Sequence, residues 1–422
     1  MKKKEKYALV LAGGGAKGAY QIGAWKAFKE LGIEICAVAG ASVGALNATL
    51  FAQNNYDQAL ELWENISLDK VVKLPPDLII DGKFHVRKFD FLHLREINKY
   101  ILKYGGLDST PLQNLINTYV NEDSIRKSNI DLGLVTVNVN RLKPVEIFLD
   151  NIPEGQLADY LLASASFPAF KQAKIDGKNY TDGGVYDNIP YKMIKERGYK
   201  KIIIVDIAGP GFNRKPDIEG TETIYIKNTT DIGSVLNFDK KILKQLLNLG
   251  YLDTMKTFGK IDGFNYFINS DPKFEKEIEN IIGNDFLIRR TLPKNMRLYK
   301  NIPLSFIECA ACILGVEKSI RYDIPDLVKE IETKYYEIVD GTKNKGKQHH
   351  FSVIKSMRKN MKKRYGKRDI FKYPPFEYYY ILSKILDGQK LKATERAFKI
   401  FFPSLTAGLL FIDKVLSSKK QS

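Results

Sequence analysis

Apolar positions in the first half of the chain form short continuous runs that alternate with longer amphipathic stretches. Residues 7–12 are typical of a buried strand, residues 19–32 of an amphipathic helix that ends on glycine, and residues 34–42 of a second strand. A helix over about residues 43–53 comes next. This β-α-β order predicts an α/β fold in which helices cover the faces of a parallel sheet.

Strand patterns return after an insertion, at about residues 55–127, that neither periodicity nor turn residues define. The pattern then predicts a helix at residues 158–164 and a hairpin at residues 171–184 that turns at Asp176 and Gly177. Apolar strands are predicted at residues 130–139, 144–149, 200–208 and 223–227. Towards the C-terminus only helices rich in Lys, Tyr and Phe are indicated. We therefore expect two domains, residues 1–272 and a mainly helical module of residues 273–422.

Composition adds a large positive charge to this picture. The chain has 422 residues, 44% of them hydrophobic, which is enough for a sizeable core. Its 66 Lys and Arg residues against 49 Asp and Glu residues give a net charge of +17, which favours an anionic partner such as nucleic acid or an acidic membrane surface. Residues 343–368 contain eleven Lys or Arg residues and no acidic one, and a solvated face and a binding surface fit this stretch equally well.

Aromatic residues follow the basic stretch, among them Tyr365, Phe371, Tyr373 and residues 378–380. Cations mixed with amphipathic rings are typical of interfacial binding, so we expect the C-terminal module to contact anionic membrane lipid peripherally. Nucleic acid is the less favoured partner, because no helix-turn-helix or RRM signature accompanies the charge.

The three cysteines are too few for a disulfide framework and fit a reducing compartment. Cys309 and Cys312 form a C-x-x-C with no second pair and no nearby histidine, and no EF-hand loop is present, so we expect no metal and no other cofactor. Residues 7–12 are too short for a signal peptide, and residues 400–412 are too short to span a bilayer. These features predict a cytoplasmic protein without a transmembrane helix, and they leave contact with the inner membrane surface open.

Gly40, Ser42 and Gly44 form a G-x-S-x-G between a predicted strand and a predicted helix, where a sharp turn exposes the serine hydroxyl. Small neighbours permit such a turn, and the helix N-terminus favours negative charge that develops nearby. An ordinary N-cap serine is the alternative. The pattern predicts a nucleophile at Ser42.

A serine nucleophile needs a base, and the four histidines are badly placed to provide one. His85 and His93 lie in the undefined insertion, and His349 and His350 lie in the basic stretch. Either of the last two still fits the chain order of an α/β-hydrolase triad.

Asp182 is the other candidate base. It comes where a predicted strand runs into Gly183 and Gly184, whose missing side chains let another backbone approach. Burial of the Asp182 carboxylate would raise its proton affinity into the working range of a base. An ordinary Asp-Gly-Gly turn is the competing interpretation, and only the serine motif favours the catalytic one.

Gly13, Gly14, Gly15 and Gly18 fit the G-x-G-x-x-G pattern between a predicted strand and a predicted helix. A dinucleotide-binding loop has this pattern, but it needs an acidic residue at the end of the next strand, and Glu34 precedes that strand. An oxyanion hole is the better interpretation, with backbone N–H groups that contribute about 2.7 to 4 kcal/mol each to lowering the barrier.

Four segments, GGGAKGAYQIG, GASVGALNA, ASASFPAF and TDGGVYDNIP, occur in the order found in patatin-like phospholipases. Over roughly residues 5–270 the chain therefore resembles that family. The resemblance implies a three-layer α/β/α fold with a mostly parallel central sheet and a Ser-Asp dyad made of Ser42 and Asp182. It also implies an oxyanion role for the glycine loop, especially for Gly14 and Gly15.

By the same resemblance, Lys17 takes a basic position that steadies the loop or meets a lipid phosphate, and Asn188 and Pro190 are structural. The expected activity is that of a phospholipase A or lysophospholipase, which releases fatty acid from phospholipid or another acyl lipid through a serine acyl-enzyme. The alternatives are a membrane-associated interaction protein without turnover and a soluble esterase or thioesterase acting on small acyl substrates.

Overall fold

The chain forms two compact units, residues 1–258 and 259–422. The predicted division between residues 272 and 273 falls beyond this boundary and stays a prediction. The computed structural model describes residues 5–74, 103–141, 143–228, 233–283, 286–344, 352–353, 355–356, 374–385, 392 and 402–416.

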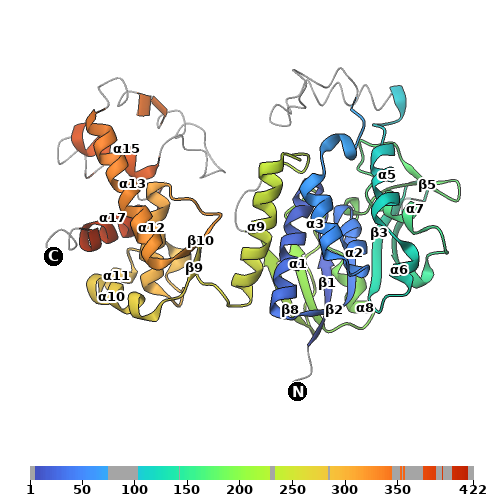
Figure 1. Ribbon diagram of the computed structural model, residues 1–422, viewed down its shortest axis with the longest axis horizontal. Coiled ribbons are helices and arrows are strands. Elements are labelled where there is room, and N and C mark those ends of the chain that lie inside the picture. Colours follow the sequence, from blue (N-terminus) through green and yellow to red (C-terminus); the bar gives the residue numbers. More distant parts are fainter. Residues whose placement is uncertain are drawn as a thin grey trace. The chain divides into compact units, whose positions relative to one another are not determined.

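The first unit is built around one eight-stranded sheet (Figure 1). Its strands are β1 Lys6–Leu11, β2 Glu34–Ala41, β3 Asp131–Asn138, β4 Lys143–Phe148, β5 Ala173–Ile175, β6 Lys178–Asp182, β7 Lys201–Asp206 and β8 Glu222–Lys227. The strand order is β5-β6-β3-β2-β1-β7-β8, and β4 pairs with β3 off this path. Strands β3, β2, β1, β7 and β8 pair in parallel, whereas β4, β5 and β6 pair antiparallel. The predicted α/β class with a mostly parallel sheet is therefore confirmed.

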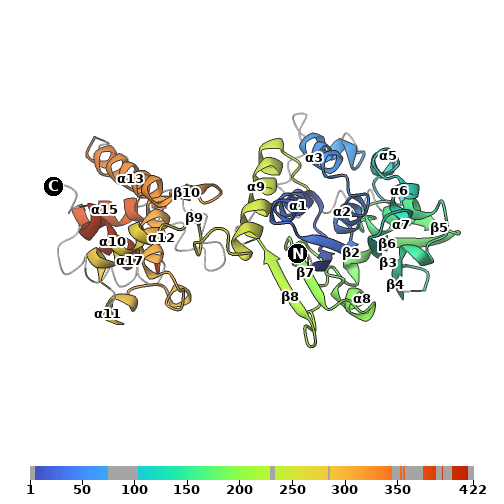
Figure 2. The ribbon, with the colours of Figure 1, turned by 60° about the horizontal axis from the view of Figure 1, so that its bottom comes forward.

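Helices cover both faces of this sheet, which gives the unit three layers (Figure 2). Its helices are α1 Ala19–Leu31, α2 Val43–Ala52, α3 Tyr56–Asn65, α5 Thr110–Tyr119, α6 Glu122–Arg126, α7 Leu157–Ser164, α8 Tyr191–Glu196 and α9 Lys240–Thr257. Single turns of 3-10 helix occur at Gly15–Gly18, Leu68–Lys70, Leu149–Asn151 and Gly183–Val185. Helices α1, α2 and α9 lie on one face, and α8 lies on the other (Figure 2).

Local residue chemistry explains where several of these elements begin and end. Helix α1 ends because Gly32 takes the left-handed conformation, with φ 66°. The hairpin of β5 and β6 turns at Asp176 and Gly177, with φ 48° and 72°, which is the backbone that a two-residue turn requires. The undefined insertion contains α3, α5 and α6, and part of it lies outside the described residues.

Strand β3 brings the two candidate catalytic side chains together. Strand β4 occupies one edge of β3 from Gly133 to Asn138, so β2 and β6 share the other edge. On that edge Ala41 of β2 pairs with Val135, and Asp182 of β6 pairs with Thr136. Because Val135 and Thr136 are consecutive, Ser42, which follows Ala41, emerges beside Asp182.

Helices α1 and α9 cross at a pair of glycines. A Cβ atom at Gly23 would lie 1.9 Å from the carbonyl oxygen of Leu247, and one at Gly250 would lie 1.8 Å from that of Tyr20. Both distances are far shorter than van der Waals contact, so only glycine fits. Beside the crossing, the buried Tyr20 hydroxyl donates a hydrogen bond of 2.9 Å to Asp253. This close contact fixes α9 against α1.

The second unit has an apolar core of its own, centred on α12. Its helices are α10 Pro272–Ile282, α11 Phe286–Arg289, α12 Ile302–Leu314, α13 Ile324–Asn344, α15 Pro375–Ile385 and α17 Leu405–Phe411, with short turns at Lys294–Met296 and Ile412–Leu416. Within α12 the fully buried Glu308 accepts hydrogen bonds from the N–H groups of Phe264 and Asn265, at 2.5 and 2.7 Å. The sequence pattern missed one feature, the parallel pair of β9 Phe267–Asn269 and β10 Arg321–Asp323, because three residues are too few to show an alternation.

The C-x-x-C of this unit belongs to its core. Cys309 is 1% exposed, and burial raises the pKa of its thiol well above the usual value, which makes it unreactive. Neither Cys309 nor Cys312 is part of a disulfide. The apolar stretch at residues 400–412 contains α17, whose Leu405 and Phe411 are buried in the same core.

The aromatic run on α15 is also packed inside the unit. Tyr378 is 1% exposed, and the half-buried Tyr379 and Tyr380 pack against the core. The interfacial role expected of Tyr378 is therefore wrong, and membrane contact by the C-terminal module stays a prediction. Most of the basic stretch, together with Tyr365, Phe371 and Tyr373, lies outside the described residues. No helix in the described part of the chain is both long and apolar enough to cross a bilayer.

Replacing Gly250 with alanine should destabilise the protein by about 1 to 3 kcal/mol, because the new methyl group meets a backbone oxygen that moves only if α1 and α9 separate. Helix propensity alone would favour alanine by about 1 kcal/mol, so the sign of the change tests the contact. Urea unfolding followed by circular dichroism measures it. The control is Lys244→Ala at an exposed position of α9, expected to stay within about 0.5 kcal/mol of the wild type. Equal stabilities of Gly250→Ala and the wild type would contradict the tight crossing.

Candidate active site

Ser42 lies on a sharp turn between β2 and α2. Its backbone has φ 56° and ψ −128°, a conformation that costs a residue other than glycine of the order of 1–3 kcal/mol. Small neighbours make the turn possible, since a Cβ at Gly40 would lie 2.2 Å from the carbonyl oxygen of Gly44, and one at Gly44 would lie 2.2 Å from that of Leu11. The turn places Ser42 at the carboxyl end of the parallel strands and at the N-terminus of α2.

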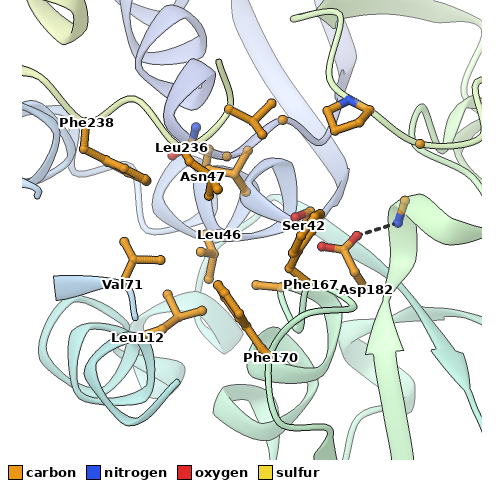
Figure 3. Close-up of a pocket in the computed structure, with 18 of the residues that line it drawn as sticks. Ser42, Leu46, Asn47, Val71, Leu112, Phe167, Phe170, Asp182, Leu236 and Phe238 are labelled. Carbon is orange, nitrogen blue, oxygen red and sulfur yellow. Dashed lines mark hydrogen bonds between the residues drawn. The ribbon is translucent and has the colours of Figure 1, made fainter. Parts of the chain in front are cut away.

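Asp182 ends β6 and is 5% exposed, with its carboxylate facing Ser42 (Figure 3). Burial raises the pKa of Asp182 to about 6, while hydrogen bonds from the Ser42 side chain and from the Gly184 N–H oppose the rise. The Gly184 N–H donates to Oδ1 at 2.7 Å. A carboxylate of this pKa is ionised at neutral pH and still accepts a proton readily, as a general base must.

The end of α7 and the residues that follow it connect the serine turn to the aspartate. The fully buried Ser164 hydroxyl donates to the carbonyl oxygen of Val135 at 2.7 Å and accepts the N–H of Ser42 at 3.1 Å. Two residues later, the carbonyl oxygen of Ser166 accepts the N–H of Asp182 at 2.8 Å. One short segment thus holds the backbones of both candidate catalytic residues.

Asn188 fixes the glycine loop between β1 and α1. The N–H of Gly13 donates to the Asn188 carbonyl oxygen at 3.1 Å, and the Asn188 side-chain amide donates back to the Gly13 carbonyl oxygen at 3.2 Å. Gly14 and Gly15 line the same cavity as Ser42. Within the described residues, neither of their N–H groups has a hydrogen-bond acceptor. Two unused donors therefore border the cavity at the serine.

The cavity beside Ser42 has a volume of about 290 Å³ and is mainly apolar. Figure 3 shows Ser42 and Asp182 at one end, and Val71 and Leu112 at the other. Asp182 is the only ionisable residue among those of the described chain that line it. The aliphatic and aromatic part of the lining consists of Val43, Leu46, Leu62, Trp63, Ile66, Val71, Leu112, Leu115, Phe167, Phe170, Val185, Val235, Leu236 and Phe238. Such a lining suits a hydrocarbon chain.

Residues 9–194 match the model of the family described as patatin-like phospholipase. This part of the chain is a patatin-like phospholipase domain. It contains the serine turn, the aspartate, the glycine loop and the segment that connects them, so the predicted family is confirmed.

Curated relatives of the patatin-like domain match about half of the chain. Patatin-like phospholipase domain-containing protein 7 of Rattus norvegicus is 25% identical over 208 residues, which are 48% of this chain and 13% of that protein. Lysophospholipase NTE1 of Eremothecium gossypii is 28% identical over 201 residues, 47% of this chain and 12% of that protein. Among solved structures, VipD from Legionella pneumophila aligns over 95% of this chain and 88% of its own at 13% identity, with a TM-score of 0.37. So low a TM-score carries no argument.

The structure separates the four loop glycines of the patatin-like domain by role. The N–H of Gly13 is used by Asn188, so the oxyanion role predicted for Gly13 does not fit. Gly18 does not line the cavity, and a Cβ there would lie 2.6 Å from the side chains of Trp63 and Val43, so its role is close packing. The predicted oxyanion role therefore narrows to the two donors of Gly14 and Gly15.

Lys17, the basic residue of the loop, is not among the described residues that line the cavity. It is 9% exposed, and its ammonium group donates to the carbonyl oxygen of Ala208 at 3.1 Å. Of its two predicted roles, the geometry fits that of steadying the loop. Gly183 meets its predicted need for close approach of another backbone, because a Cβ there would lie 2.1 Å from the carbonyl oxygen of Val135. A Cβ at Gly184 would instead meet a side chain, with the Asn188 Oδ1 atom at 2.8 Å.

Other predicted candidates fall on residues that the structure does not describe. All four histidines lie outside the described residues. In the described part of the chain, no group of three or more His, Cys, Asp or Glu side chains is arranged to hold a metal ion. Sequence reasoning missed Ser164, although it lies in the ASASFPAF segment, because a serine hydroxyl that bonds to backbone has no sequence pattern of its own.

Replacing Ser164 with alanine should lower kcat for ester hydrolysis by up to about 10²-fold and leave KM nearly unchanged, because the serine turn loses the acceptor that positions it. Initial rates on a soluble p-nitrophenyl ester measure both constants. The matched control is Ser166→Ala, since the Ser166 hydroxyl is also buried but bonds to the carbonyl oxygen of Leu162 instead. A similar loss of kcat in both variants would show that Ser164 has no specific positioning role.

Proposed function

We propose that the patatin-like domain hydrolyses acyl esters of lipids, with Ser42 as nucleophile and Asp182 as general base. One observation carries the proposal: a strained serine faces a buried carboxylate at one end of an apolar cavity. The family of residues 9–194 supports lipid-ester hydrolysis.

In the proposed reaction, Asp182 accepts the hydroxyl proton of Ser42 while the oxygen attacks the ester carbonyl carbon, and the N–H groups of Gly14 and Gly15 bind the oxyanion. The tetrahedral intermediate then collapses, and the departing alcohol takes the proton from Asp182 as the ester bond breaks. Water next gives a proton to Asp182 and attacks the acyl-enzyme. The fatty acid leaves, and the serine hydroxyl recovers its proton.

The cavity indicates which part of the substrate it binds. Its apolar lining suits the acyl chain, and no lining residue of the described chain has a positive charge to pair with a phosphate. In the proposed complex the acyl chain extends from Ser42 towards Val71 and Leu112, and the alcohol part of the ester stays outside. Phospholipids and lysophospholipids both meet this requirement.

The dyad is tested by fatty-acid release from phosphatidylcholine and lysophosphatidylcholine with calcium chelated. Ser42→Ala and Asp182→Asn should each lower the rate by at least about 10³-fold, because each removes a group that acts directly on the reacting atoms. The matched control is Asp187→Asn, a carboxylate that is 1% exposed but does not line the cavity. An unchanged rate in Ser42→Ala would refute the proposal. A folded wild-type protein that releases no fatty acid would favour an interaction protein without turnover.

The pH dependence of kcat/KM should report the proposed base. Only ionised Asp182 accepts a proton, so the rate should rise with pH and level off above about 6, the raised pKa of this carboxylate. Burial also raises the pKa of Asp187 to about 6, so the Asp187→Asn variant separates the two groups and should keep the acid limb. Loss of the limb in Asp187→Asn, or a rate that is flat from about pH 5 to about pH 7, would contradict the assignment.

A further inference from the structure

The open end of the cavity is bordered by large apolar side chains that water can reach. Phe167 is 39% exposed and Val185 is 52% exposed, and both also line the cavity. Phe212 is 62% exposed, the highest value among the large apolar side chains described in the first unit. We call these three residues the rim.

Backbone hydrogen bonds place Phe212 beside the catalytic segment. Its N–H donates to the carbonyl oxygen of Gly184 at 2.8 Å, and its carbonyl oxygen accepts the N–H of Asn188 at 3.0 Å. The preceding Gly211 lines the cavity, and a Cβ there would lie 2.7 Å from the carbonyl oxygen of Gly184. The Phe212 backbone is therefore held next to Gly184 and the Asp182 turn, and its side chain is largely exposed.

We propose that the rim inserts into a phospholipid surface and places the open end of the cavity against the hydrocarbon. This proposal rests on the proposed function, because it names the form in which the lipid substrate reaches Ser42. Phe167 and Val185 belong both to the exposed rim and to the lining, so the apolar surface is continuous from solvent to the serine. An acyl chain then passes from the lipid to Ser42 without entering water, so the free energy needed to expose its apolar area to water is smaller.

A cation accompanies the rim. The guanidinium group of Arg214 lies 4.3 Å from the centre of the Tyr186 ring and 5.8 Å from that of Phe212, and Arg214 is exposed. Aromatic rings beside an arginine are typical of the zone between lipid headgroups and hydrocarbon, where the ring is buried and the charge meets phosphate. This arrangement favours a phospholipid surface over a purely apolar protein partner.

The test compares two similarly exposed apolar residues. Phe212 belongs to the rim. Ile218, which is 56% exposed, precedes β8 and so lies at the amino end of the parallel strands, whereas Ser42 lies at their carboxyl end. In a Ser42→Ala background, sedimentation with phosphatidylcholine vesicles should show about tenfold weaker binding for Phe212→Ser and no change for Ile218→Ser. Working in this background keeps binding independent of turnover.

Tryptophan at the same two positions gives a second measurement. Phe212→Trp should keep vesicle binding, and its emission should shift to the blue when vesicles are added, because the indole enters the hydrocarbon boundary. Ile218→Trp should show no shift. With Ser42 intact, Phe212→Ser should hydrolyse a soluble short-chain ester at the wild-type rate and vesicle lipid about tenfold more slowly.

Several results would contradict the proposal that the rim inserts into a phospholipid surface. They are equal vesicle binding by Phe212→Ser and its parent, equal losses in Phe212→Ser and Ile218→Ser, and no binding of the parent to vesicles. A dimer that Phe212→Ser converts to a monomer would show that a second copy of the chain covers the rim instead. If Phe212→Ser loses vesicle binding while the wild type hydrolyses no ester, membrane insertion of the rim is supported and the proposed function is refuted.

Discussion

The candidate site depends on the way in which β3 shares one of its edges between two strands. The parallel strand β2 pairs with this edge up to Val135, and the antiparallel strand β6 continues the pairing from Thr136. The end of one strand therefore meets the end of the other, and Ser42 and Asp182 come from segments 140 positions apart in the chain (182 − 42). Because backbone hydrogen bonds set this register, the distance between the two side chains is defined by the sheet rather than by flexible loops.

The strain at Ser42 is supported by its surroundings. The positive φ of this residue persists because the Ser164 hydroxyl accepts the Ser42 N–H, and because Gly40 and Gly44 let the strand, the helix and β1 approach one another. Asn188 provides a similar constraint on the glycine loop through its two hydrogen bonds to Gly13. Ser42 and the glycine loop are thus each held by a buried polar side chain that is not itself proposed to act on the ester.

The sequence predicted the parts of this arrangement that have a local pattern. The β-α-β alternation, the serine turn, the hairpin at Asp176 and Gly177 and the Asp-Gly-Gly turn all follow from periodicity or from residues with special backbone freedom. What the sequence did not predict depends on tertiary contacts: the bond from Ser164 to the serine turn, and the α1–α9 glycine crossing. The mistaken interfacial role of Tyr378 has the same origin, because an aromatic run looks alike whether it faces lipid or a core.

Burial at Asp182 connects the chemistry of the site to the kind of substrate it accepts. The carboxylate loses hydration because its surroundings are apolar, and the hydrogen bonds from Ser42 and Gly184 limit the rise in its pKa to about 6. A polar substrate group in the cavity would bring water to this carboxylate and lower its basicity. An acyl chain does neither, since it fills the apolar space towards Val71 and Leu112 and excludes water from the base. The same low polarity that raises the pKa of Asp182, the proposed base, therefore also favours a hydrocarbon chain as the part of a substrate that enters.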